Sequence, residues 1–565
     1  MKPALEHIFQ AQCAPDFRGH LKSSPSLRLT RYSVGLVTVL TILLASCGGS
    51  GGSQQTQQQQ GQPFTVSPLL QAPLLMPGNS VQVPIGVVQF PGTSGTVNIK
   101  ISGPSGITVT PNSLLVTAYA SQPTVTLAAA NPLASGTYTY TVTSTDGNMT
   151  TSSIIVASVV QPPPSPSPLQ ANILYSFGTQ EGHPGGPLVA DSAGNLYGVA
   201  GLEIYKLSNS NGAWQESVLY TFTQVDTGPL PWGSLVIDAA GNLYGVTTNG
   251  GSTNPNCGPP GCGMVYELSP SAAGWQLTVL YNFLGGADGS EPGAGLVLDK
   301  AGNIYGTTEN GGYSNGPCFG ACGTVFTLTP SPSGWMHTVI YEFQGLTQGF
   351  MPNSTLVWDQ QGNLYGTTQG GGYESSSLGG NATCDGGCGT VFELSNSGGA
   401  WQGQTIYSFA GLGTDGVDPR GVVIDLAGNL YGVTNLGGFS SLQCGGSIGN
   451  VFELSPAGTS WNISQLYYFL GCNLGSQPWN LILEDAGNLY GTAGAGLSAC
   501  SNGGCGVVFK LAENAQQWGI TEVDDFPGGA GGEGPDYVTL VSGKLYGVSG
   551  GGGASNMGTV FEITP

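Results

Sequence analysis

One five-residue string recurs seven times in the C-terminal part of this 565-residue chain. The string Gly-Asn-Leu-Tyr-Gly, with one substitution in the third copy and one in the last, begins at Gly194, Gly241, Gly302, Gly362, Gly428, Gly487 and Gly543. Successive copies lie 47 to 66 residues apart. Repeats of this length in a β-rich sequence are typical of a β-propeller, in which each repeat forms one blade.

One repeat shows how a blade is built. Its expected strands are residues 296–299, 303–308, 323–328 and 335–343. Asp299 and Gly302 stand in the first turn, where an Asp side chain bonds the backbone ahead and Gly takes the left-handed conformation. Each repeat therefore predicts four antiparallel strands.

The two ends of the repeat array match each other. Residues 171–177 match the fourth strand of other repeats, whereas the last repeat ends at 558–563, which match a third strand. Pairing the first segment with the last would complete the final blade and cover both unpaired edges. We therefore predict an all-β fold with a closed seven-bladed propeller of four-stranded blades over 171–565.

The chain before the propeller changes character several times. Residues 63–160 alternate Val, Thr, Ile and Tyr with turn formers, which predicts an Ig-like β-sandwich. Residues 48–62 are a Gly-, Ser- and Gln-rich flexible tether, and 161–170 are a stiff Pro-rich linker. Residues 1–47 are a leader containing a signal peptide.

The leader has the composition of a lipoprotein signal. Arg28 and Arg31 precede an apolar run over 34–45, and small residues lead to Cys47. The run of about 12 residues is shorter than the roughly 20 that a transmembrane helix needs, which disfavours the alternative of a membrane-spanning anchor. The segment resembles the bacterial lipobox, which implies lipidation of Cys47. Gly48, which is not Asp, implies sorting to the outer membrane or cell surface.

Charge restricts the possible partners. The chain carries 11 basic and 32 acidic residues, and 5 of the basic but only 2 of the acidic ones precede Cys47. The exported part is therefore strongly acidic and would repel a phosphate backbone. We expect no nucleic-acid partner.

Eight cysteines form local pairs in the loops between second and third strands. The pairs are Cys257–Cys262, Cys318–Cys322, Cys384–Cys388 and Cys500–Cys505. In an exported protein such pairs predict disulfides, whereas a metal site would need four ligands that converge. Cys444 and Cys472 lie in loops expected on one face of the fifth repeat, so we predict a longer disulfide between them. We expect no metal and no cofactor.

Acidic residues recur in two places. The first set stands before the hairpin glycine, at Asp191, Asp238, Asp299, Asp359, Asp425 and Asp485. Calcium would need several oxygens from one loop, so we assign these residues to turns. The second set lies between the fourth strand of one repeat and the first strand of the next, at Asp288, Glu291, Asp415 and Asp418. These loops should share a face with the disulfide loops, which makes this face the candidate binding surface, although Asp-Gly and Pro also simply build turns.

Aromatic residues divide into repeated and unrepeated ones. The repeated positions are Tyr197, Tyr244, Tyr305, Tyr365, Tyr431, Tyr490 and Tyr546, with Trp214, Trp275, Trp335, Trp401, Trp461 and Trp518. Their fixed place predicts packing between blades, although stacked rings can also bind sugars. Trp232 and Trp479 fall outside the pattern, in loops between strand four and strand one, and are better candidates for ligand contact.

The repeats resemble a known family. Asp-x-x-Gly-Asn-Leu-Tyr-Gly followed by Gly-Thr-Val-Phe-Glu-Leu is similar to the bacterial GloVer tandem repeat of secreted choice-of-anchor proteins, and the likeness spans 171–565. It implies a surface location and supplies no catalytic residues. The last copy departs from the motif, with Val541 and Ser542 where the Asp should be and Lys544 in place of Asn.

The sequence shows no catalytic site. The array holds five Lys and Arg, and no single repeat carries its own cluster of ionisable residues. We therefore expect a membrane-anchored, non-enzymatic repeat scaffold that binds a glycan or a surface protein through the disulfide-bearing face. The alternative is a polysaccharide-acting hydrolase or lyase on the same scaffold.

Overall fold

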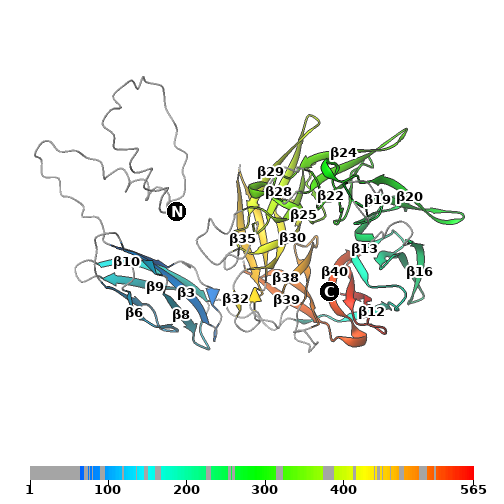
Figure 1. The fold of residues 1–565 in the computed structure, drawn as a ribbon. Coiled ribbons are helices and arrows are strands. Elements are labelled where there is room, and N and C mark those ends of the chain that lie inside the picture. The colour runs from blue at the N-terminus through cyan, green and yellow to red at the C-terminus, as the bar shows by residue number, and fades with distance from the viewer. Residues whose placement is uncertain are drawn as a thin grey trace, which may run out of the picture. The chain divides into compact units, whose positions relative to one another are not determined.

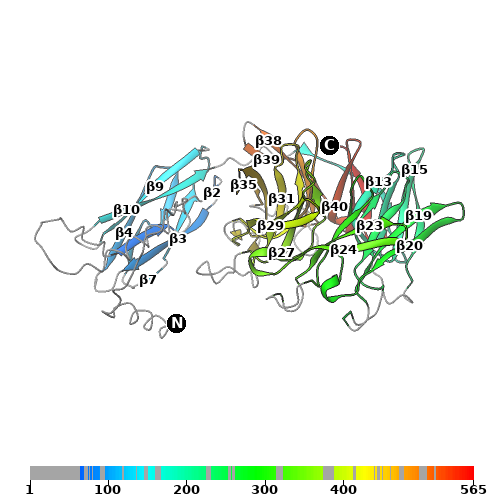
Figure 2. The same cartoon turned by 90° about the horizontal axis from the view of Figure 1, so that it is seen from above.

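A computed structural model gives the fold of two compact units, within residues 1–160 and 161–565 (Figures 1 and 2). It describes residues 64–68, 74–75, 77–78, 80–89, 96–116, 120–121, 123–134, 136–145, 150–159 and 167–565, the last range with gaps at 224–230, 252–255, 258–260, 313–317, 319–321, 373–386, 412–414, 438–439, 442–445, 448, 459, 470–475, 495–504 and 515–516. Cys47, Cys384, Cys444, Cys472 and Cys500 lie outside these residues, so the predictions that rest on them stay predictions.

The first unit consists of two sheets that share one apolar core. The first sheet contains β1 (Phe64–Pro68), β3 (Ser80–Gln89), β5 (Ile107–Thr110), β7 (Ala120–Ser121) and β8 (Thr124–Ala129). The second contains β2 (Leu74–Leu75), β4 (Val97–Ser102), β6 (Ser113–Val116), β9 (Gly136–Thr145) and β10 (Thr150–Val159). Val83 and Leu127 of the first sheet and Val142 and Ile155 of the second are fully buried in that core. Alternation of apolar and polar residues produces these half-buried strands.

The described residues of the second unit form seven sheets of four or five strands, numbered here 1 to 7 in chain order, and one two-stranded sheet of β32 (Ser440–Ser441) and β33 (Gly446–Ser447). Their first strands are β13 (Pro184–Ala190), β17 (Pro231–Ile237), β21 (Val297–Leu298), β25 (Phe350–Pro352) with β26 (Val357–Trp358), β30 (Val417–Ile424), β36 (Pro478–Leu483) and β40 (Glu533–Val541). The second strands are β14 (Leu196–Ala200), β18 (Leu243–Thr247), β22 (Ile304–Thr308), β27 (Leu364–Gly370), β31 (Leu430–Leu436), β37 (Leu489–Ala493) and β41 (Lys544–Gly551). The first and second strands are neighbours in every one of these sheets.

In sheets 1 to 6 the third and fourth strands form a long hairpin. The third strands are β15 (Glu203–Ser210), β19 (Met264–Ser271), β23 (Thr324–Ser331), β28 (Thr390–Ser397), β34 (Asn450–Ala457), β38 (Val507–Asn514) and β42 (Thr559–Ile563). The fourth strands of sheets 1 to 6 are β16 (Ala213–Thr221), β20 (Gly274–Asn282), β24 (Gly334–Glu342), β29 (Ala400–Ser408), β35 (Ser460–Tyr468) and β39 (Gln517–Asp525). Short elements in the loops are β32 (Ser440–Ser441), β33 (Gly446–Ser447), η2 (Gly286–Asp288), η3 (Leu346–Gln348) and η6 (Gly529–Gly531).

The fourth strand of sheet 7 comes from the other end of the array. β12 (Ala171–Ser176) pairs antiparallel with β42, as the matching ends of the repeats predict. β40 of sheet 7 also lies against β13 of sheet 1, so the red and the green-cyan strands are neighbours in both views. The start and the end of the array therefore meet.

The second glycine of each repeated string makes room for an aromatic ring. A Cβ built on this glycine would lie closer than 3.0 Å to the ring of the third-strand residue opposite, as for Gly306 and Phe326. The same relation holds at Gly198, Gly245, Gly366, Gly432, Gly491 and Gly547. The motif therefore encodes a cross-strand fit between a missing side chain and a large one.

Each of these rings also contacts a phenylalanine of the preceding sheet. The Phe follows the fourth strand, and the two ring centroids lie 4.9 to 5.3 Å apart in an edge-to-face arrangement. The pairs are Phe177–Tyr205, Phe222–Tyr266, Phe283–Phe326, Phe343–Phe392, Phe409–Phe452, Phe469–Phe509 and Phe526–Phe561. Phe177 follows β12, so its pair joins sheet 7 to sheet 1.

A second joint couples a glycine to the proline that opens the next sheet. The glycine precedes the third strand with a positive φ, and an added Cβ would lie closer than 3.0 Å to the proline Cδ. The pairs are Gly263–Pro292, Gly323–Pro352, Gly389–Pro419, Gly449–Pro478, Gly506–Pro535 and Gly558–Pro184. Only glycine, which has no side chain, avoids this clash.

The Pro-rich linker ends inside the second unit. β11 (Ser167–Pro168) pairs parallel with β39, and the Leu169 amide donates to the Val523 carbonyl at 2.8 Å. Leu169 is buried. The expected linker of 161–170 is therefore too long at its C-terminal end, because its last residues extend sheet 6. Within the described residues, no helix is both long and apolar enough to cross a membrane.

The glycine–proline joint gives a test of the fold. Gly389 has φ 101° and contacts Pro419, whereas Gly399 has φ 92° and open space around it. Gly389→Ala should lower the free energy of unfolding by about 1–3 kcal/mol more than Gly399→Ala, because only the first alanine overlaps a neighbour. Urea denaturation of the two variants measures the difference. Equal losses would show that the joint does not constrain the sheets.

Candidate functional site

The repeated Asp residues are turn residues. In five repeats one carboxylate oxygen accepts two backbone N–H groups, and the other accepts the Asn amide and the Tyr hydroxyl of the same string. Burial alone would raise the pKa of Asp238, but hydrogen bonds from Asn242, Tyr244 and Ala240 outweigh it and lower the pKa. The same balance lowers the pKa of Asp191 and Asp299. The string Asp-x-x-Gly-Asn-Leu-Tyr thus describes one hydrogen-bonded turn.

The sixth repeat departs from the prediction. Glu484, not Asp485, closes its turn, since the Asn488 side chain donates to Glu484 Oε2 at 2.6 Å. Glu484 is three residues before Gly487, which is the spacing of the other repeats. The seventh repeat has a two-residue turn at Ser542 and Gly543, both with positive φ. The assignment of Asp485 was an error of register.

The acids between fourth and first strands also hold their own loops together. Asp288 accepts hydrogen bonds from the Tyr281 hydroxyl at 2.7 Å and the Leu284 amide at 2.8 Å. Asp415 accepts from the Tyr407 hydroxyl at 2.5 Å and from the amide of Ala410. Burial would raise the pKa of Asp288, but its hydrogen bonds, from His337 first, lower it. These two carboxylates are therefore part of the frame, by which we mean the strands, turns and loops that the repeats share.

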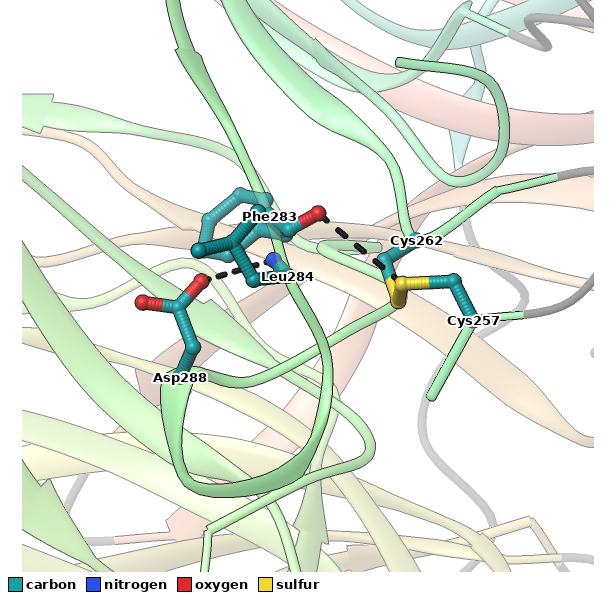
Figure 3. Close-up of a disulfide and its surroundings, with 5 residues drawn as sticks. All are labelled: Cys257, Cys262, Phe283, Leu284 and Asp288. Carbon is teal, nitrogen blue, oxygen red and sulfur yellow. Dashed lines mark hydrogen bonds between the residues drawn. A yellow bond between two sulfur atoms is a disulfide. The ribbon is translucent and has the colours of Figure 1, made fainter. Parts of the chain in front are cut away.

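A disulfide lies against the Asp288 loop (Figure 3). Cys257 Sγ is 3.9 Å from the Phe283 carbonyl oxygen, and Asp288 holds the next amide, of Leu284, from the other side. The bonds Cys257–Cys262 and Cys318–Cys322 are present as predicted, and Cys388 and Cys505 are each disulfide-bonded. The disulfide loops and the acidic loops therefore lie together in sheet 2, as expected.

The residue before each opening proline links these loops to the next sheet. Glu291 and Asp418 have φ of 56° and 59°, and their amides donate to the carbonyls of Cys262 and Cys388 at 2.9 and 3.0 Å. Met351 and Gly534 form the same bond with Cys322 and Cys505. The backbone of Glu291 and Asp418 thus makes a hydrogen bond that other repeats also make at this position. Their side chains differ from those of the other repeats.

The repeated Tyr and Trp residues pack between sheets, as predicted. Six of the seven Tyr residues of the second strands, all but Tyr490, meet the Trp of the next sheet's fourth strand, with centroids 6.0 to 6.5 Å apart. The pairs are Tyr197–Trp275, Tyr244–Trp335, Tyr305–Trp401, Tyr365–Trp461, Tyr431–Trp518 and Tyr546–Trp214. The last pair joins sheet 7 to sheet 1.

Unrepeated residues gather at the start of the first strands. Arg420 Nη2 contacts Asp418 Oδ2 at 2.5 Å, and its guanidinium lies 4.0 Å from the centre of the Trp479 ring. Trp479 in turn hydrogen-bonds to Tyr537. Arg420 acts electrostatically on Glu309 of sheet 3 and Tyr537 of sheet 7. We call Glu309, Asp418, Arg420, Trp479, Asp536 and Tyr537 the four-sheet cluster, since they come from sheets 3, 5, 6 and 7.

The carboxyl groups of the four-sheet cluster have raised pKa values. Burial raises the pKa of Asp536 to about 6. Burial, and then the charge of Glu291, raise the pKa of Glu309, while Arg420 opposes them. Burial also raises the pKa of Asp418, against the lowering effect of Arg420. Carboxyl groups with perturbed pKa values are common at functional sites.

Sequence reasoning missed most of this cluster. It named Asp418 and Trp479 but not Glu309, Arg420, Asp536 or Tyr537, since no single repeat carries more than two of these residues. One signal was available, because the residue after each opening proline differs in nearly every repeat: Gly185, Trp232, Gly293, Asn353, Arg420, Trp479 and Asp536. Trp232 and Trp479 lie in first strands β17 and β36 rather than in the preceding loops, and the Trp232 side chain is outside the described part.

The model of the Gloeobacter/Verrucomicrobia repeat matches residues 130–380 and 373–565. The chain belongs to the Gloeobacter/Verrucomicrobia repeat family. The match covers all seven sheets and confirms the resemblance that the repeated strings indicate. No curated protein matches the chain.

Solved structures similar to this family member share little sequence with it. A quinonprotein alcohol dehydrogenase-like protein from Bacteroides thetaiotaomicron is 10% identical, with a TM-score of 0.33 over 80% of this chain and 94% of the other. A DUF4784 family protein from Bacteroides caccae is 10% identical, with a TM-score of 0.26 over 81% and 98%. The sialidase of Trypanosoma rangeli is 14% identical, with a TM-score of 0.31 over 63% and 56%. TM-scores this low support no conclusion about activity.

The two classes of Asp predict opposite pH dependence. Since folding raises the pKa of Asp536 to about 6, its contribution to stability is lost as the pH rises from about 4 through 6. Asp536→Asn should therefore gain stability over the parent between pH 4 and pH 8, by up to about 3 kcal/mol. Urea denaturation across that range measures the gain.

Asp238→Asn is the matched control. The lowered pKa of Asp238 stabilises the fold above the unfolded value and is lost as the pH falls below about 4. This variant should be less stable than the parent at neutral pH, with a gap that narrows in acid. A parallel pH profile for both variants would contradict the assignments.

Proposed function

We propose that this chain is a non-enzymatic binding scaffold, displayed at the cell envelope, which holds a glycan or a surface protein on its disulfide-bearing face. One observation carries the proposal. The repeated polar residues are used within the frame, whereas the unrepeated ones gather beside the loops that carry the disulfides. A constant frame with variable residues at one place is the pattern of a recognition surface.

The proposed architecture is a seven-bladed β-propeller. Seven aromatic pairs link consecutive sheets, and Phe177–Tyr205 links the last to the first. Gly558–Pro184, Tyr546–Trp214 and the β12–β42 pairing join the same two sheets or complete the last one. Arg420 also acts on residues of sheets 3 and 7, neither of which adjoins its own sheet in the chain, as expected if the sheets surround an axis.

The first unit is proposed to be an Ig-like spacer. Two mainly antiparallel sheets on one core support this assignment. Its described residues 64–159 contain a single charged side chain, Lys100, which offers little for catalysis. A spacer of this kind would hold the repeat unit away from a membrane.

The leader supports export and lipid anchoring at Cys47. The disulfides of the repeat unit fit an oxidising compartment outside the cytoplasm. The strongly acidic composition disfavours nucleic acid as a partner. We therefore propose attachment to the outer membrane or cell surface.

A second candidate function is polysaccharide cleavage. Glu309 and Asp536 have raised pKa values, as a general acid requires. Asp288 and Asp415, two other carboxyl groups of the candidate binding surface, are bonded within their loops. If the chain is a hydrolase or lyase, Glu309 and Asp536 are the residues to test.

The anchor has a direct test. Mass spectrometry of the mature protein should find diacylglyceryl-modified Cys47 at its N-terminus. Cys47→Ala should move the protein from the membrane fraction to the soluble fraction. Continued fractionation of this variant with membranes would contradict lipid anchoring.

The binding function is tested with the full chain on a glycan array and against purified envelope proteins. We expect a retained ligand and no released product. Mild reduction of the disulfides should weaken the binding while the far-UV spectrum stays unchanged. Release of reducing sugar, lost in Asp536→Asn, would favour the enzyme, and failure to retain any ligand would contradict the scaffold.

A further inference from the structure

Three residues of the four-sheet cluster lie at β-bulges in the first strands of their sheets. Pairing with the second strand shifts register between Pro419 and Val422, between Pro478 and Asn480, and between Pro535 and Tyr537. Arg420, Trp479 and Asp536 stand within these three bulges. A bulge redirects a side chain out of the regular alternation of a strand. Three adjacent sheets therefore redirect an unrepeated side chain at the same position.

Glu309 takes the corresponding place in sheet 3. Its sheet has glycine after the opening proline, and a Cβ on Gly293 would lie 2.6 Å from Glu309 Oε1. The carboxylate thus fills the space that the missing side chain leaves. Sheet 7 shows the reverse arrangement, in which Gly550 of the second strand makes room for Asp536.

Asn353 places sheet 4 in the same series. It follows Pro352, the last residue of β25, as Arg420 follows Pro419 of β30, and a Cβ added to the next residue, Gly421, would lie 3.4 Å from Ser354 Cβ. The Gly421 amide also donates to Thr367 Oγ1 of sheet 4 at 3.0 Å. Asn353 and Arg420 are therefore matching positions on neighbouring first strands.

Several polar atoms at these positions have no partner within the described part of the chain. They are Asn353 Oδ1 and Nδ2, Arg420 Nε and Asp418 Oδ1, and all four are shielded from solvent. Asp418 as a whole is only 7% exposed. Buried polar atoms are nearly always satisfied in folded proteins, so unsatisfied ones indicate water or a bound group.

We propose that these residues bind a neutral saccharide, with Asn353, Asp418 and Arg420 as its hydrogen-bonding partners and Trp479 as an aromatic wall. This inference deepens the proposed binding function and rests on it. The free atoms comprise two donors and two acceptors, which suits sugar hydroxyls because each hydroxyl both donates and accepts. Asp418 and Glu309 both interact with the one guanidinium of Arg420, and this excess of acidic groups disfavours anionic ligands such as uronates and phosphates.

The test is affinity electrophoresis of the full chain in gels containing laminarin, galactomannan, xyloglucan or soluble starch, with polygalacturonate as the anionic comparison. At least one neutral polymer should retard the protein, and polygalacturonate should not. Asn353→Ala should weaken the binding about tenfold, the effect of losing roughly 1.4 kcal/mol of interaction. This change breaks no internal hydrogen bond, so the variant should fold. Arg420→Gln should weaken binding at least as much.

Two matched variants serve as controls. Asn462→Ala removes an exposed asparagine from outer strand β35, and Lys300→Gln removes a cation from an exposed turn. Both should bind like the parent. The inference is overturned if no neutral polymer retards the chain, if polygalacturonate binds better, or if Asn353→Ala and Arg420→Gln bind unchanged. A ligand found on the array that is lost on disulfide reduction but not in these variants would retain the scaffold function and reject this site.

Discussion

The edge-to-face contact between a phenylalanine and the aromatic residue of the next sheet is the interaction on which the second unit depends. It occurs between every consecutive pair of sheets, with nearly constant centroid distance. Each receiving ring is held in turn by a glycine that has no side chain to displace it. The spacing between sheets is therefore set by the size of rigid aromatic rings that pack against one another and against glycine backbone. Flexible aliphatic side chains, which could adapt to several spacings, do not make this contact.

This constraint explains the composition of the chain. Glycine supplies 95 of the 565 residues, and two glycines in most repeats are required by contact, one beneath the ring and one against the opening proline. The Asp of each such turn, the following Asn and the Tyr likewise take part in one hydrogen-bonded network, as for Asp238, Asn242 and Tyr244. Residues that have no role in the frame are free to differ between repeats, and they differ at the position after the opening proline.

Local features of the fold could be predicted from the sequence because each is encoded within a few residues. The strands, the Asp turns, the disulfides of adjacent cysteines and the pairing of Tyr with Trp all follow from the repeated strings. The four-sheet cluster could not, since Glu309, Arg420 and Asp536 are more than 100 residues apart from one another and meet only through the arrangement of the sheets. The extension of sheet 6 by β11 was also missed, because a Ser-Pro pair in a proline-rich stretch carries no strand signal.

The route by which the chain enters the second unit has a mechanical consequence. β11 and β12 are the first described segments of this unit, and they pair with strands of sheets 6 and 7, which are the last to be synthesised. Tension applied from the N-terminal side therefore reaches β11 and its pairing with sheet 6 before it reaches β12 and sheet 7. A pull on such a protein would load the two sheets at the end of the array first, before those in its middle.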